Sequence, residues 1–377
     1  MMILVQMNKK IIILSSVHPW DDTRIFEKEA KSLAKKFNVE LHAIGDFDEM
    51  EIDGIRVFGH ERGSRLFPIK IWIIYFKIAL STRESIIHFH DPDLVLLGLI
   101  LKIFGKTVIY DVHEDVSSQI LDKSWIPTII RKPISWLYNL FEKFCSSYFD
   151  TVIVVTEHIK KQFKEENTII IHNYPRLEGF PLKTYEQNLD SPFRVIYVGL
   201  ISAERGIFEI IEASKLIGKS PSIEINIIGS FASKIIEEDF YHRISESNAS
   251  INYLGSLKYK DAMNLLYNSD AGLVCFHPRP NHINALPNKI FEYMRAGLPI
   301  VSSNFSLWKK IILDNNCGLT IDPLSPEEIA GAIKNLAANR ETANALGSNG
   351  RRLVEKYYNW ENEEEKLYDL YAKLIDS

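Results

Sequence analysis

The chain has 377 residues, of which 46% are hydrophobic and 25% charged, the balance of a folded protein with two domains or one large one. Its formal net charge of -5 argues against a protein that binds nucleic acid through bulk basic charge. No stretch approaches the roughly 20 apolar residues that cross a bilayer, the start lacks the features of a signal peptide, and the three cysteines show no paired spacing. We therefore expect a cytoplasmic protein with reduced thiols.

Short apolar runs alternate with helical patterns along the whole chain. In the first half, strands are predicted at 11–15, 39–44, 85–89, 107–110, 151–155 and 168–171, with helical patterns such as 24–36 and 94–104 between them. In the second half, strands are predicted at 193–198, 223–228, 251–254, 271–275, 299–302 and 318–321. Continuous β-branched runs separated by helices are typical of parallel sheets covered on both faces. Two such series predict an α/β protein with two doubly wound, Rossmann-like domains.

The domain boundary is expected near 175–192, which is rich in proline and glycine and has little apolar periodicity. We predict an N-terminal domain over 1–180, a second domain over 190–358 and a terminal helix over 360–377. Ligands of open parallel sheets bind beyond the carboxyl ends of the strands, so the site is expected in a cleft between the two domains.

The loop after the first predicted strand offers the polar residues His18, Asp22 and Arg24. Asp21 or Asp22 is also expected to cap the helical pattern that begins at Arg24. Further along, Asp91-Pro92-Asp93 looks like an Asp-x-Asp metal motif, but we interpret it as a helix start with Asp91 as N-cap and Pro92 in the first turn.

His88 and His90 alternate along a predicted strand, and we expect them to face opposite sides and to make a poor metal pair. No other cluster has ligand spacing, so no essential metal and no cofactor is predicted. His113 follows the strand predicted at 107–110. Three acidic residues, Asp111, Glu114 and Asp115, lie beside it in the sequence. Such crowding at a strand terminus favours a functional site over a capping histidine.

The loop after the strand at 193–198 begins at Gly199 and contains Arg205 and Gly206. A strand, loop and helix in this order often bind an anion, and the fork of donors of Arg205 can hold phosphate oxygens in two places. Gly229 and Gly255 follow the next two strands and permit close backbone approach, although isolated Gly-Ser turns are common.

The segment from Asn284 to Ile300 reads as a loop, a short helix and a buried strand. Pro287 fits the first helical turn and Gly297 the position just past the helix end. Lys289 and Glu292 lie one turn apart and share a face. Free N–H groups, a cation and a carboxylate together suit a nucleotide diphosphate. The alternative is an amphipathic surface helix in which Glu292 pairs with Lys289 or Arg295.

Phe291-Glu292-Tyr293-Met294 followed by Ala296-Gly297-Leu298-Pro299 resembles the donor-binding signature of glycosyltransferase family 4, the retaining sugar transferases with the GT-B fold. The resemblance extends over nearly the whole chain. It implies two Rossmann-like domains that face each other across a cleft and a C-terminal helix that crosses back onto the first domain, with 357–360 as the crossing point.

The resemblance also implies roles for individual residues. It places the catalytic groups at His113, Arg205 and Lys289, and the acceptor-side groups at His18, Asp22 and Arg24. The donor-binding residues would be Gly199, Arg205, Gly229, Asn284, Ala285, Leu286, Lys289 and Glu292. Two positions depart from the family pattern: Leu200 stands where a basic residue is usual, and Asn284 stands where the first of two glutamates is usual. Asn284 can hydrogen-bond a sugar hydroxyl but supplies no charge.

Two segments, 62–77 and 123–138, mix basic and aromatic residues. Such segments suit an interfacial helix on anionic lipid, and the alternative is a pair of domain helices with snorkelling lysine and arginine side chains. Family members that work on lipid-linked glycans dock in this way, so peripheral contact with the inner face of the cell membrane is expected.

The sequence thus predicts a retaining glycosyltransferase that moves a sugar from a UDP- or GDP-linked donor to a hydroxyl of a growing, lipid-linked, cell-surface glycan such as capsule or O-antigen. Two alternatives stay open. One is a GT-B sugar-nucleotide epimerase, and the other is a catalytically degenerate partner protein, which the departures at Leu200 and Asn284 would fit. A nicotinamide dehydrogenase is unfavoured, because no Gly-x-Gly-x-x-Gly follows a strand.

Overall fold

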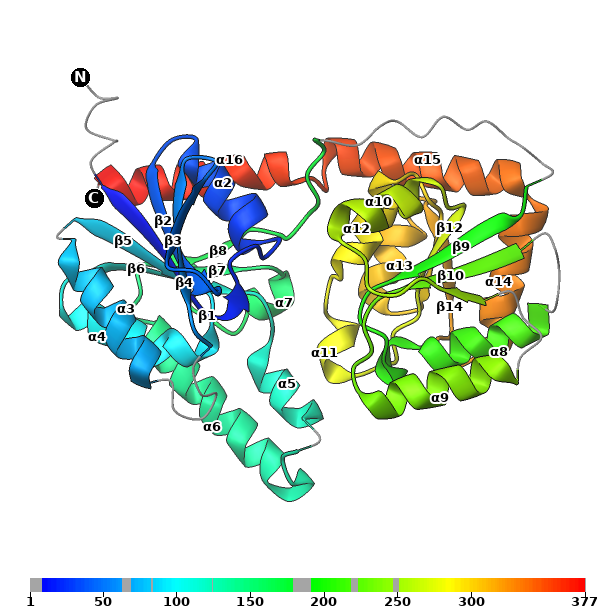
Figure 1. Ribbon diagram of the computed structural model, residues 1–377, viewed down its shortest axis with the longest axis horizontal. Coiled ribbons are helices and arrows are strands. Elements are labelled where there is room, and N and C mark those ends of the chain that lie inside the picture. Colours follow the sequence, from blue (N-terminus) through cyan, green and yellow to red (C-terminus); the bar gives the residue numbers. More distant parts are fainter. Residues whose placement is uncertain are drawn as a thin grey trace. The chain divides into compact units, whose positions relative to one another are not determined.

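The computed structural model describes residues 9–62, 69–82, 84–123, 125–178, 191–217, 223–246 and 251–376. The chain divides into two compact units, Met1–Arg176 with Trp360–Ser377, and Leu177–Asn359. Each unit is a sheet flanked by helices (Figure 1). The expectation of a cleft between the two domains stays a prediction.

In the first unit the strands are β1 (Lys10–Pro19), β2 (Asn38–Ile44), β3 (Glu49–Ile52), β4 (Ile55–His60), β5 (Ser85–Phe89), β6 (Thr107–Val112), β7 (Thr151–Val154) and β8 (Thr168–Ile170). The helical segments are η1 (Ile25–Ala30), α2 (Lys31–Ala34), α3 (Ile69–Ser81), η2 (Pro92–Leu94), α4 (Val95–Ile103), α5 (Val116–Asp122), α6 (Thr128–Ser146), α7 (Glu157–Lys160), η3 (Glu165–Asn167) and α16 (Trp360–Asp376). The sheet order is β3-β4-β2-β1-β5-β6-β7-β8, and all neighbours pair in parallel except β3 with β4.

The central strands of this sheet are buried on both faces because apolar β-branched residues fill both sides of the pleat. Ile11 and Ile13 of β1 face a layer that contains η1, α2 and α16, with Trp360 and Tyr371 of α16 fully buried there. Ile12 of the same strand faces the opposite layer, which contains α3, α4 and the end of α6. The C-terminal helix α16 is therefore part of the core of the first unit.

In the second unit the strands are β9 (Phe193–Val198), β10 (Ile223–Ile228), β11 (Ile251–Tyr253), β12 (Ala271–Val274), β13 (Ile300–Ser303) and β14 (Gly318–Ile321). The helical segments are η4 (Ala203–Arg205), α8 (Ile207–Ile217), α9 (Lys234–Ser245), α10 (Tyr259–Tyr267), α11 (Pro280–Ile283), α12 (Asn288–Arg295), α13 (Ser306–Ile312), α14 (Pro326–Ala338) and α15 (Arg340–Lys356). The sheet order is β11-β10-β9-β12-β13-β14, and all paired strands are parallel.

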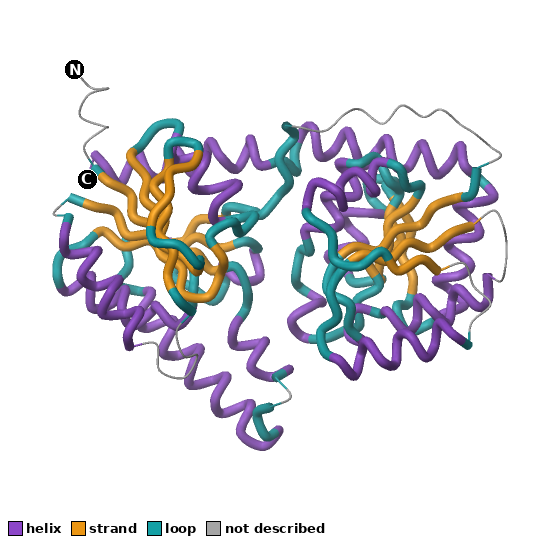
Figure 2. The backbone as a smooth tube through the Cα atoms, viewed as in Figure 1, coloured by secondary structure: helices purple, strands orange, loops and turns teal. Residues whose placement is uncertain are grey.

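Helices cover both faces of this second sheet as well (Figure 2). One face packs against α8, α9 and α14 in a single apolar core. On the other face α12 approaches β12 closely, because Gly272 leaves room for the ring of Tyr293 directly above its α-carbon. The predicted strands are all present, and β9, β10 and β14 begin and end as predicted.

The sequence-based expectation missed one hairpin. Strands β3 and β4 pair in antiparallel fashion at the edge of the first sheet. They are joined by Asp53 and Gly54, which both have positive φ, at 53° and 75°. An Asp-Gly pair at such a turn is a strong hairpin signal, but the strands that flank it are short and half polar.

Candidate functional site

Three glycine-bearing loops lie together at the carboxyl ends of β9, β10 and β11. Gly199 N–H donates to the carbonyl oxygen of Ile228 at 2.8 Å, and Gly229 N–H donates to that of Gly255 at 2.9 Å. Gly199 and Gly229 have φ values of 132° and 148°, and a Cβ on Gly229 would overlap the carbonyl of Gly199. The loops therefore pack backbone against backbone, which only glycine allows here.

Two cationic side chains meet above the first of these loops. Lys289 from α12 lies over Gly199, where a Cβ would overlap its Nζ, and Nη1 of Arg205 would lie 3.6 Å from that same Cβ. Both cations flank the ring of Phe276, at 5.2 Å for Arg205 and 5.6 Å for Lys289. The structure thus brings together Gly199, Arg205 and Lys289, as the sequence analysis expected.

No carboxylate in the described part of the chain forms an ion pair with either cation. Burial, together with the charge of Arg205, lowers the pKa of Lys289 to about 7, and Glu292 opposes the shift. Two partly buried positive groups that repel each other form a site that an added anion would stabilise.

Helix α12 presents these groups in the way its sequence suggests, with one difference. Pro287 is the N-cap residue rather than part of the first turn, since the helix begins at Asn288. Gly297 follows the helix end with φ of 69°, as expected. The carboxylate of Glu292 is half-buried and has no hydrogen-bond or ion-pair partner among the described residues. The interpretation of α12 as a surface helix with Glu292 paired to Lys289 or Arg295 is therefore wrong.

The loop before α12 is held from both sides. Nε2 of His277 lies 3.0 Å from a carboxylate oxygen of Glu209, and Nδ1 of His282 lies 3.0 Å from the carbonyl oxygen of His277. Trp308 Nε1 donates to the carbonyl oxygen of Ala285 at 2.7 Å. Asn284 is exposed, whereas Ala285 and Leu286 are half-buried. These contacts fix the backbone of the loop that precedes Lys289. The Asn284 side chain stays exposed to solvent.

In the first unit, the loop that ends β1 is organised by one buried carboxylate. Asp91 accepts hydrogen bonds from Ser15 Oγ at 2.7 Å and from Ser16 N–H at 2.6 Å, and it pairs with Nδ1 of His18 at 2.8 Å. The hydrogen bond to Asp91 raises the pKa of His18. Asp91 occupies the N-cap position of η2 with Pro92 after it, but its side chain makes no capping hydrogen bond, contrary to the expectation.

His113 lies beside this loop and is partly exposed. Its Nε2 is 3.0 Å from Nδ1 of His90 and 3.3 Å from a carboxylate oxygen of Asp111, and its ring centre is 5.9 Å from that of His18. The predicted residues His18 and His113 therefore belong to one cluster. Asp22 caps the next helical segment, because its Oδ1 accepts from the N–H groups of Arg24 at 2.8 Å and Ile25 at 3.0 Å.

Arg24 does not lie on an accessible surface, where an acceptor-side residue was expected. Its side chain is buried, and its Nη2 donates to both oxygens of Asp111 at 3.0 and 2.9 Å. It also donates to the carbonyl oxygen of Ile171 at 3.2 Å. The guanidinium therefore has a structural role in the interior of the first unit, where it holds the Asp111 carboxylate next to His113.

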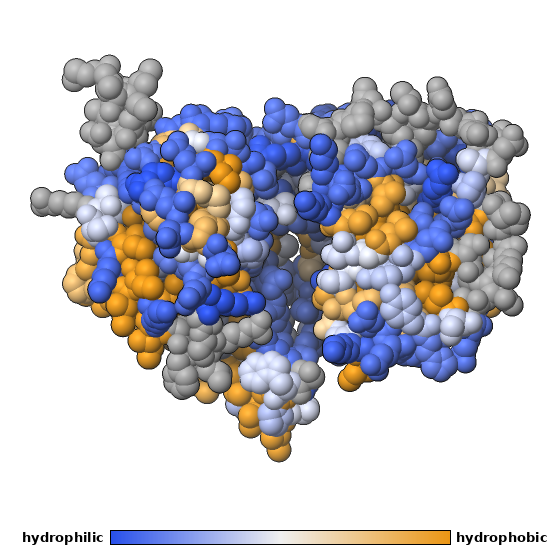
Figure 3. Space-filling model, in the orientation of Figure 1, coloured by the Kyte–Doolittle hydropathy of each residue, from blue (hydrophilic) through white to orange (hydrophobic). Residues whose placement is uncertain are grey.

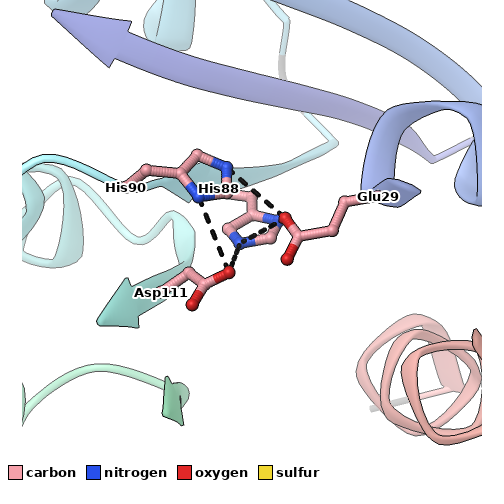
Figure 4. A group of neighbouring side chains, drawn as sticks. All are labelled: Glu29, His88, His90 and Asp111. Carbon is pink, nitrogen blue, oxygen red and sulfur yellow. Dashed lines mark ion pairs between the residues drawn. The ribbon is translucent and has the colours of Figure 1, made fainter. Parts of the chain in front are cut away.

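The expectation for His88 and His90 was wrong. Residues two apart on a strand project to the same face, and the two imidazole rings lie 4.5 Å apart. They face the carboxylates of Glu29 and Asp111 in a fully buried group (Figure 4). The statement that no cluster has ligand spacing therefore fails at this place, while the prediction that the reaction needs no metal stays a prediction.

Residues 183–353 match the family model for glycosyl transferases group 1. These residues include the Gly199 loop, both cations and Glu292. The chain contains a glycosyltransferase group 1 domain. Among characterised relatives, the capsular polysaccharide biosynthesis glycosyltransferase CapM of Staphylococcus aureus is 24% identical over 90% of this chain and 92% of its own length. A GDP-mannose-dependent mannosyltransferase acting on phosphatidylinositol monomannoside in Mycobacterium tuberculosis is 31% identical over 21% of the chain and 20% of its own length.

Solved structures resemble the whole chain. The sucrose-phosphate synthase of Thermosynechococcus elongatus superimposes with a TM-score of 0.80 at 17% identity, over 98% of this chain and 99% of that one. HepE of Anabaena, solved with UDP-glucose, gives a TM-score of 0.74 at 15% identity, over 97% and 99% of the two chains. The glycosyltransferase group 1 domain is therefore the second half of a GT-B fold, as the sequence predicted.

Proposed function

We propose that this protein is a retaining glycosyltransferase of family 4. It transfers a sugar from a UDP- or GDP-linked donor to a hydroxyl of a growing, lipid-linked, cell-surface glycan. The observation that carries the proposal is the pair of cations without carboxylate partners, Arg205 and Lys289, over the backbone of Gly199. Such a pair matches the two phosphates of a nucleotide sugar in charge.

The leaving group gives these cations their role. When the bond between the anomeric carbon and the phosphate oxygen breaks, its electron pair stays on the diphosphate. The negative charge of the diphosphate therefore increases. Arg205 can bind two phosphate oxygens at once, and Lys289 adds a point charge. No side chain caps the start of α12, so its first N–H groups would add to the binding of the phosphates. These groups stabilise the transition state more than the bound donor, so they accelerate the reaction.

No carboxylate stands out as a nucleophile on the sugar. We infer a front-face substitution, in which the acceptor oxygen bonds to the anomeric carbon on the side that the phosphate leaves. The acceptor proton passes to the departing phosphate oxygen, so no separate base and no metal is required. His113 would contact the donor sugar, with Asp111 and His90 holding its ring. His18 and Asp22 would lie on the acceptor side.

The remaining donor contacts follow from the second unit. The half-buried carboxylate of Glu292 would accept hydrogen bonds from the ribose hydroxyls. The N–H group of Leu286 would bind the sugar or the phosphate, whereas that of Ala285 already donates to the carbonyl oxygen of His282 at 3.2 Å. The Asn284 amide would bind a sugar hydroxyl. Binding of the sugar through backbone groups accounts for a neutral side chain at position 284. The similarity to CapM, a glycosyltransferase of capsular polysaccharide biosynthesis, supports a cell-surface glycan as the acceptor.

A surface of the first unit fits an anionic membrane. Helix α6 exposes a stripe of large apolar side chains, namely Ile129, Trp136, Leu137, Leu140 and Phe144, with Trp125 just before the helix. Exposed lysines Lys132 and Lys143 lie on the same helix. Apolar side chains also gather over α3 and α4 in the same unit (Figure 3).

Exposed apolar area of this extent, edged with lysines, is typical of a membrane-interaction surface. The predicted segment at 62–77 supports it only in part, because residues 63–68 lie outside the described residues. None of the described helices is long and apolar enough to span a membrane. The occupant we propose is therefore the surface of an anionic bilayer, which also holds a lipid-linked acceptor.

A panel of UDP- and GDP-sugars tests the donor assignment. A ligand that binds only the native state raises the melting temperature, and the panel member that does so identifies the donor. Arg205→Ala and Glu292→Ala should abolish most of that shift and lower turnover by about 100-fold. Arg194→Ala, at the opposite end of β9, is the matched control and should leave both unchanged.

Three outcomes would overturn the proposal. Near-normal rates in both site variants would defeat the residue roles. A C2 epimer formed from UDP-GlcNAc without acceptor would favour the epimerase. Nucleotide binding without release of UDP or GDP in the presence of membrane glycolipid would favour the degenerate partner protein.

A further inference from the structure

A group of buried ionisable side chains lies in the core of the first unit and takes no part in the proposed donor chemistry. Glu29 comes from η1, His88 from β5, His90 from the position after β5, and Asp111 from β6. One ligand atom from each residue can be chosen so that all four atoms lie within 4.8 Å of one another. The four side chains point toward one another in Figure 4, and all are buried.

Most inward-facing atoms of this group have no hydrogen-bond partner. Oε2 of Glu29 and the Nε2 atoms of His88 and His90 are buried and without a hydrogen bond in the described part of the chain, while Oε1 of Glu29 lies 3.0 Å from Nε of Arg24. Buried polar atoms are nearly always satisfied, so several orphans that face one another indicate something between them.

A tautomer with the hydrogen on Nδ1 is available to both imidazoles, and Nδ1 of His90 also lies 3.6 Å from Oδ2 of Asp111. Nδ1 of His88 lies 2.8 Å from the hydroxyl of Tyr371, and Nδ1 of His90 lies 3.0 Å from Nε2 of His113. When each Nδ1 carries the hydrogen and donates it outward, each Nε2 offers its lone pair inward. Metal-binding histidines have this arrangement, in which a neighbour on the far nitrogen sets the tautomer.

We propose that Glu29, His88, His90 and Asp111 bind one divalent transition-metal ion, with Zn²⁺ as the ion that their ligand atoms fit best. Oε2 of Glu29 lies 3.6 Å from Nε2 of His90 and 3.9 Å from Nε2 of His88, and Nε2 of His88 lies 3.9 Å from Oδ2 of Asp111. A regular tetrahedron with Zn–N and Zn–O bonds of about 2.0–2.1 Å has edges of about 3.3–3.4 Å. The three distances exceed these edges by about 0.2–0.6 Å, and the four atoms, which lie within 4.8 Å of one another, would move together when an ion binds.

The ligand types select the class of ion. Imidazole nitrogens with carboxylate oxygens suit zinc and its first-row neighbours, whereas Ca²⁺ and Mg²⁺ prefer oxygen alone. Arg24 completes the outer shell, because its Nε lies 3.0 Å from Oε1 of Glu29 and its Nη2 binds Asp111. The other oxygen of Glu29, Oε2, is the one that faces the two histidines.

A single proton is the competing occupant. Burial and the nearby charge of Asp111 raise the pKa of Glu29 well above its usual range, so Glu29 can hold a proton that it donates to Asp111. Such a proton leaves both inward Nε2 lone pairs without a partner, whereas a metal ion satisfies both together with the two carboxylates. A metal ion therefore pairs with more of the buried lone pairs than a proton does.

The site would be structural. Both histidine side chains and both carboxylates are fully buried, so all positions on the ion come from the protein and none is open to substrate. It would join η1, β5 and β6, and through Tyr371 it would fix α16. The inference is independent of the proposed transfer chemistry.

Metal content measured on the full chain tests the proposal. The protein is produced without a histidine tag in medium supplied with zinc, passed over a chelating resin and analysed by elemental mass spectrometry. About one zinc per chain is expected, because a sealed site exchanges slowly. Unfolding in guanidinium with chelator, followed by refolding with Co²⁺, should give the visible absorption of tetrahedral cobalt.

Variants locate the ion. His88→Asn and His90→Gln should each lower the zinc content at least tenfold. His60→Gln is the control, since His60 lies 3.1 Å from Nδ1 of His42 in a separate pair on the same sheet, and it should keep the full content. If a ligand variant fails to fold, the wild-type measurements decide. Wild-type protein with less than about 0.1 zinc per chain and no cobalt spectrum would show that a proton or water occupies the group, which overturns the proposal.

Discussion

The amine of Lys289 lies directly over the α-carbon of Gly199, in the space that any side chain at position 199 would need. Gly199 also has φ of 132°, a backbone conformation that residues with a Cβ rarely adopt. Two independent constraints therefore require glycine here. One is the backbone turn after β9, and the other is the approach of the cation that we assign to the donor diphosphate.

Gly199→Ala should weaken binding of the nucleotide sugar at least tenfold, because the new methyl group displaces Lys289 and strains the loop. The strain should also lower the free energy of unfolding by about 1–3 kcal/mol. Calorimetric titration and urea denaturation measure the two effects. Gly331→Ala is the control, since Gly331 lies in α14 with nothing within 4 Å of an added Cβ. It should bind normally and gain up to about 1 kcal/mol. Equal affinity in both variants would contradict the placement of Lys289.

The pKa of Lys289 predicts how donor binding depends on pH. In the free protein this pKa is lowered to about 7, so Lys289 is charged below pH 7 and loses its charge above it. A bound diphosphate favours the charged form and raises the pKa, so binding above pH 7 takes up a proton. Affinity for a nucleotide sugar should be constant below pH 7 and fall by up to about tenfold for each pH unit above it.

Calorimetry in two buffers of different ionisation enthalpy would measure the proton uptake at pH 8. Lys289→Arg should remove both the uptake and the decline, because arginine stays charged throughout. A decline that persists unchanged in this variant would show that another group titrates. A nucleotide sugar is the proper probe, because its diphosphate is esterified at both ends and does not itself titrate in this range.

The grouping of Gly199, Arg205 and Lys289 could be predicted because its signals are local. Gly199, Arg205 and the turn from Lys289 to Glu292 each lie within a few residues of a strand or helix end, where sequence fixes the geometry. The carboxyl ends of parallel strands meet at one edge of the sheet, so the loops come together. The position of each functional group follows from fold class and spacing alone.

The core of the first unit could not be predicted in the same way. Arg24 reads as an exposed cation in a loop, because its partner Asp111 is 87 residues away in the chain. Glu29 belongs to a helical pattern, and nothing local shows that its face packs on β5. The histidine pair, in contrast, was predictable, since the two-residue period of a strand places His88 and His90 on one face.

Arg24→Met should destabilise the protein by about 3–5 kcal/mol, because it leaves Asp111 buried with its main positive partner removed. Urea denaturation followed by circular dichroism measures the loss. Lys70→Met is the control, since Lys70 is largely exposed and pairs with the exposed Glu61 at 3.3 Å, and it should cost at most about 1 kcal/mol. Equal losses in the two variants would mean that Arg24 contributes no more than a surface ion pair. Adding Asp111→Asn to Arg24→Met should recover part of the stability.

The apolar stripe on α6 predicts binding to anionic vesicles. Co-sedimentation with phosphatidylglycerol-containing vesicles should be strong at low salt and weaker as salt screens Lys132 and Lys143. Trp136→Ser, which removes a side chain that is 62% exposed, should weaken binding at least tenfold, because burial of a large apolar side chain contributes about 2 kcal/mol.

Tyr241→Ser serves as the control for this experiment, since Tyr241 is exposed to 50% but lies in the second unit on α9. It should bind vesicles like the unmodified protein. The salt dependence separates the two contributions, because Trp136→Ser should lower binding at every salt concentration, whereas Lys132→Glu should do so mainly at low salt. Equally strong binding to neutral and anionic vesicles would show that the lysines do not contribute to binding. No binding to either at low salt would leave α6 without a membrane role.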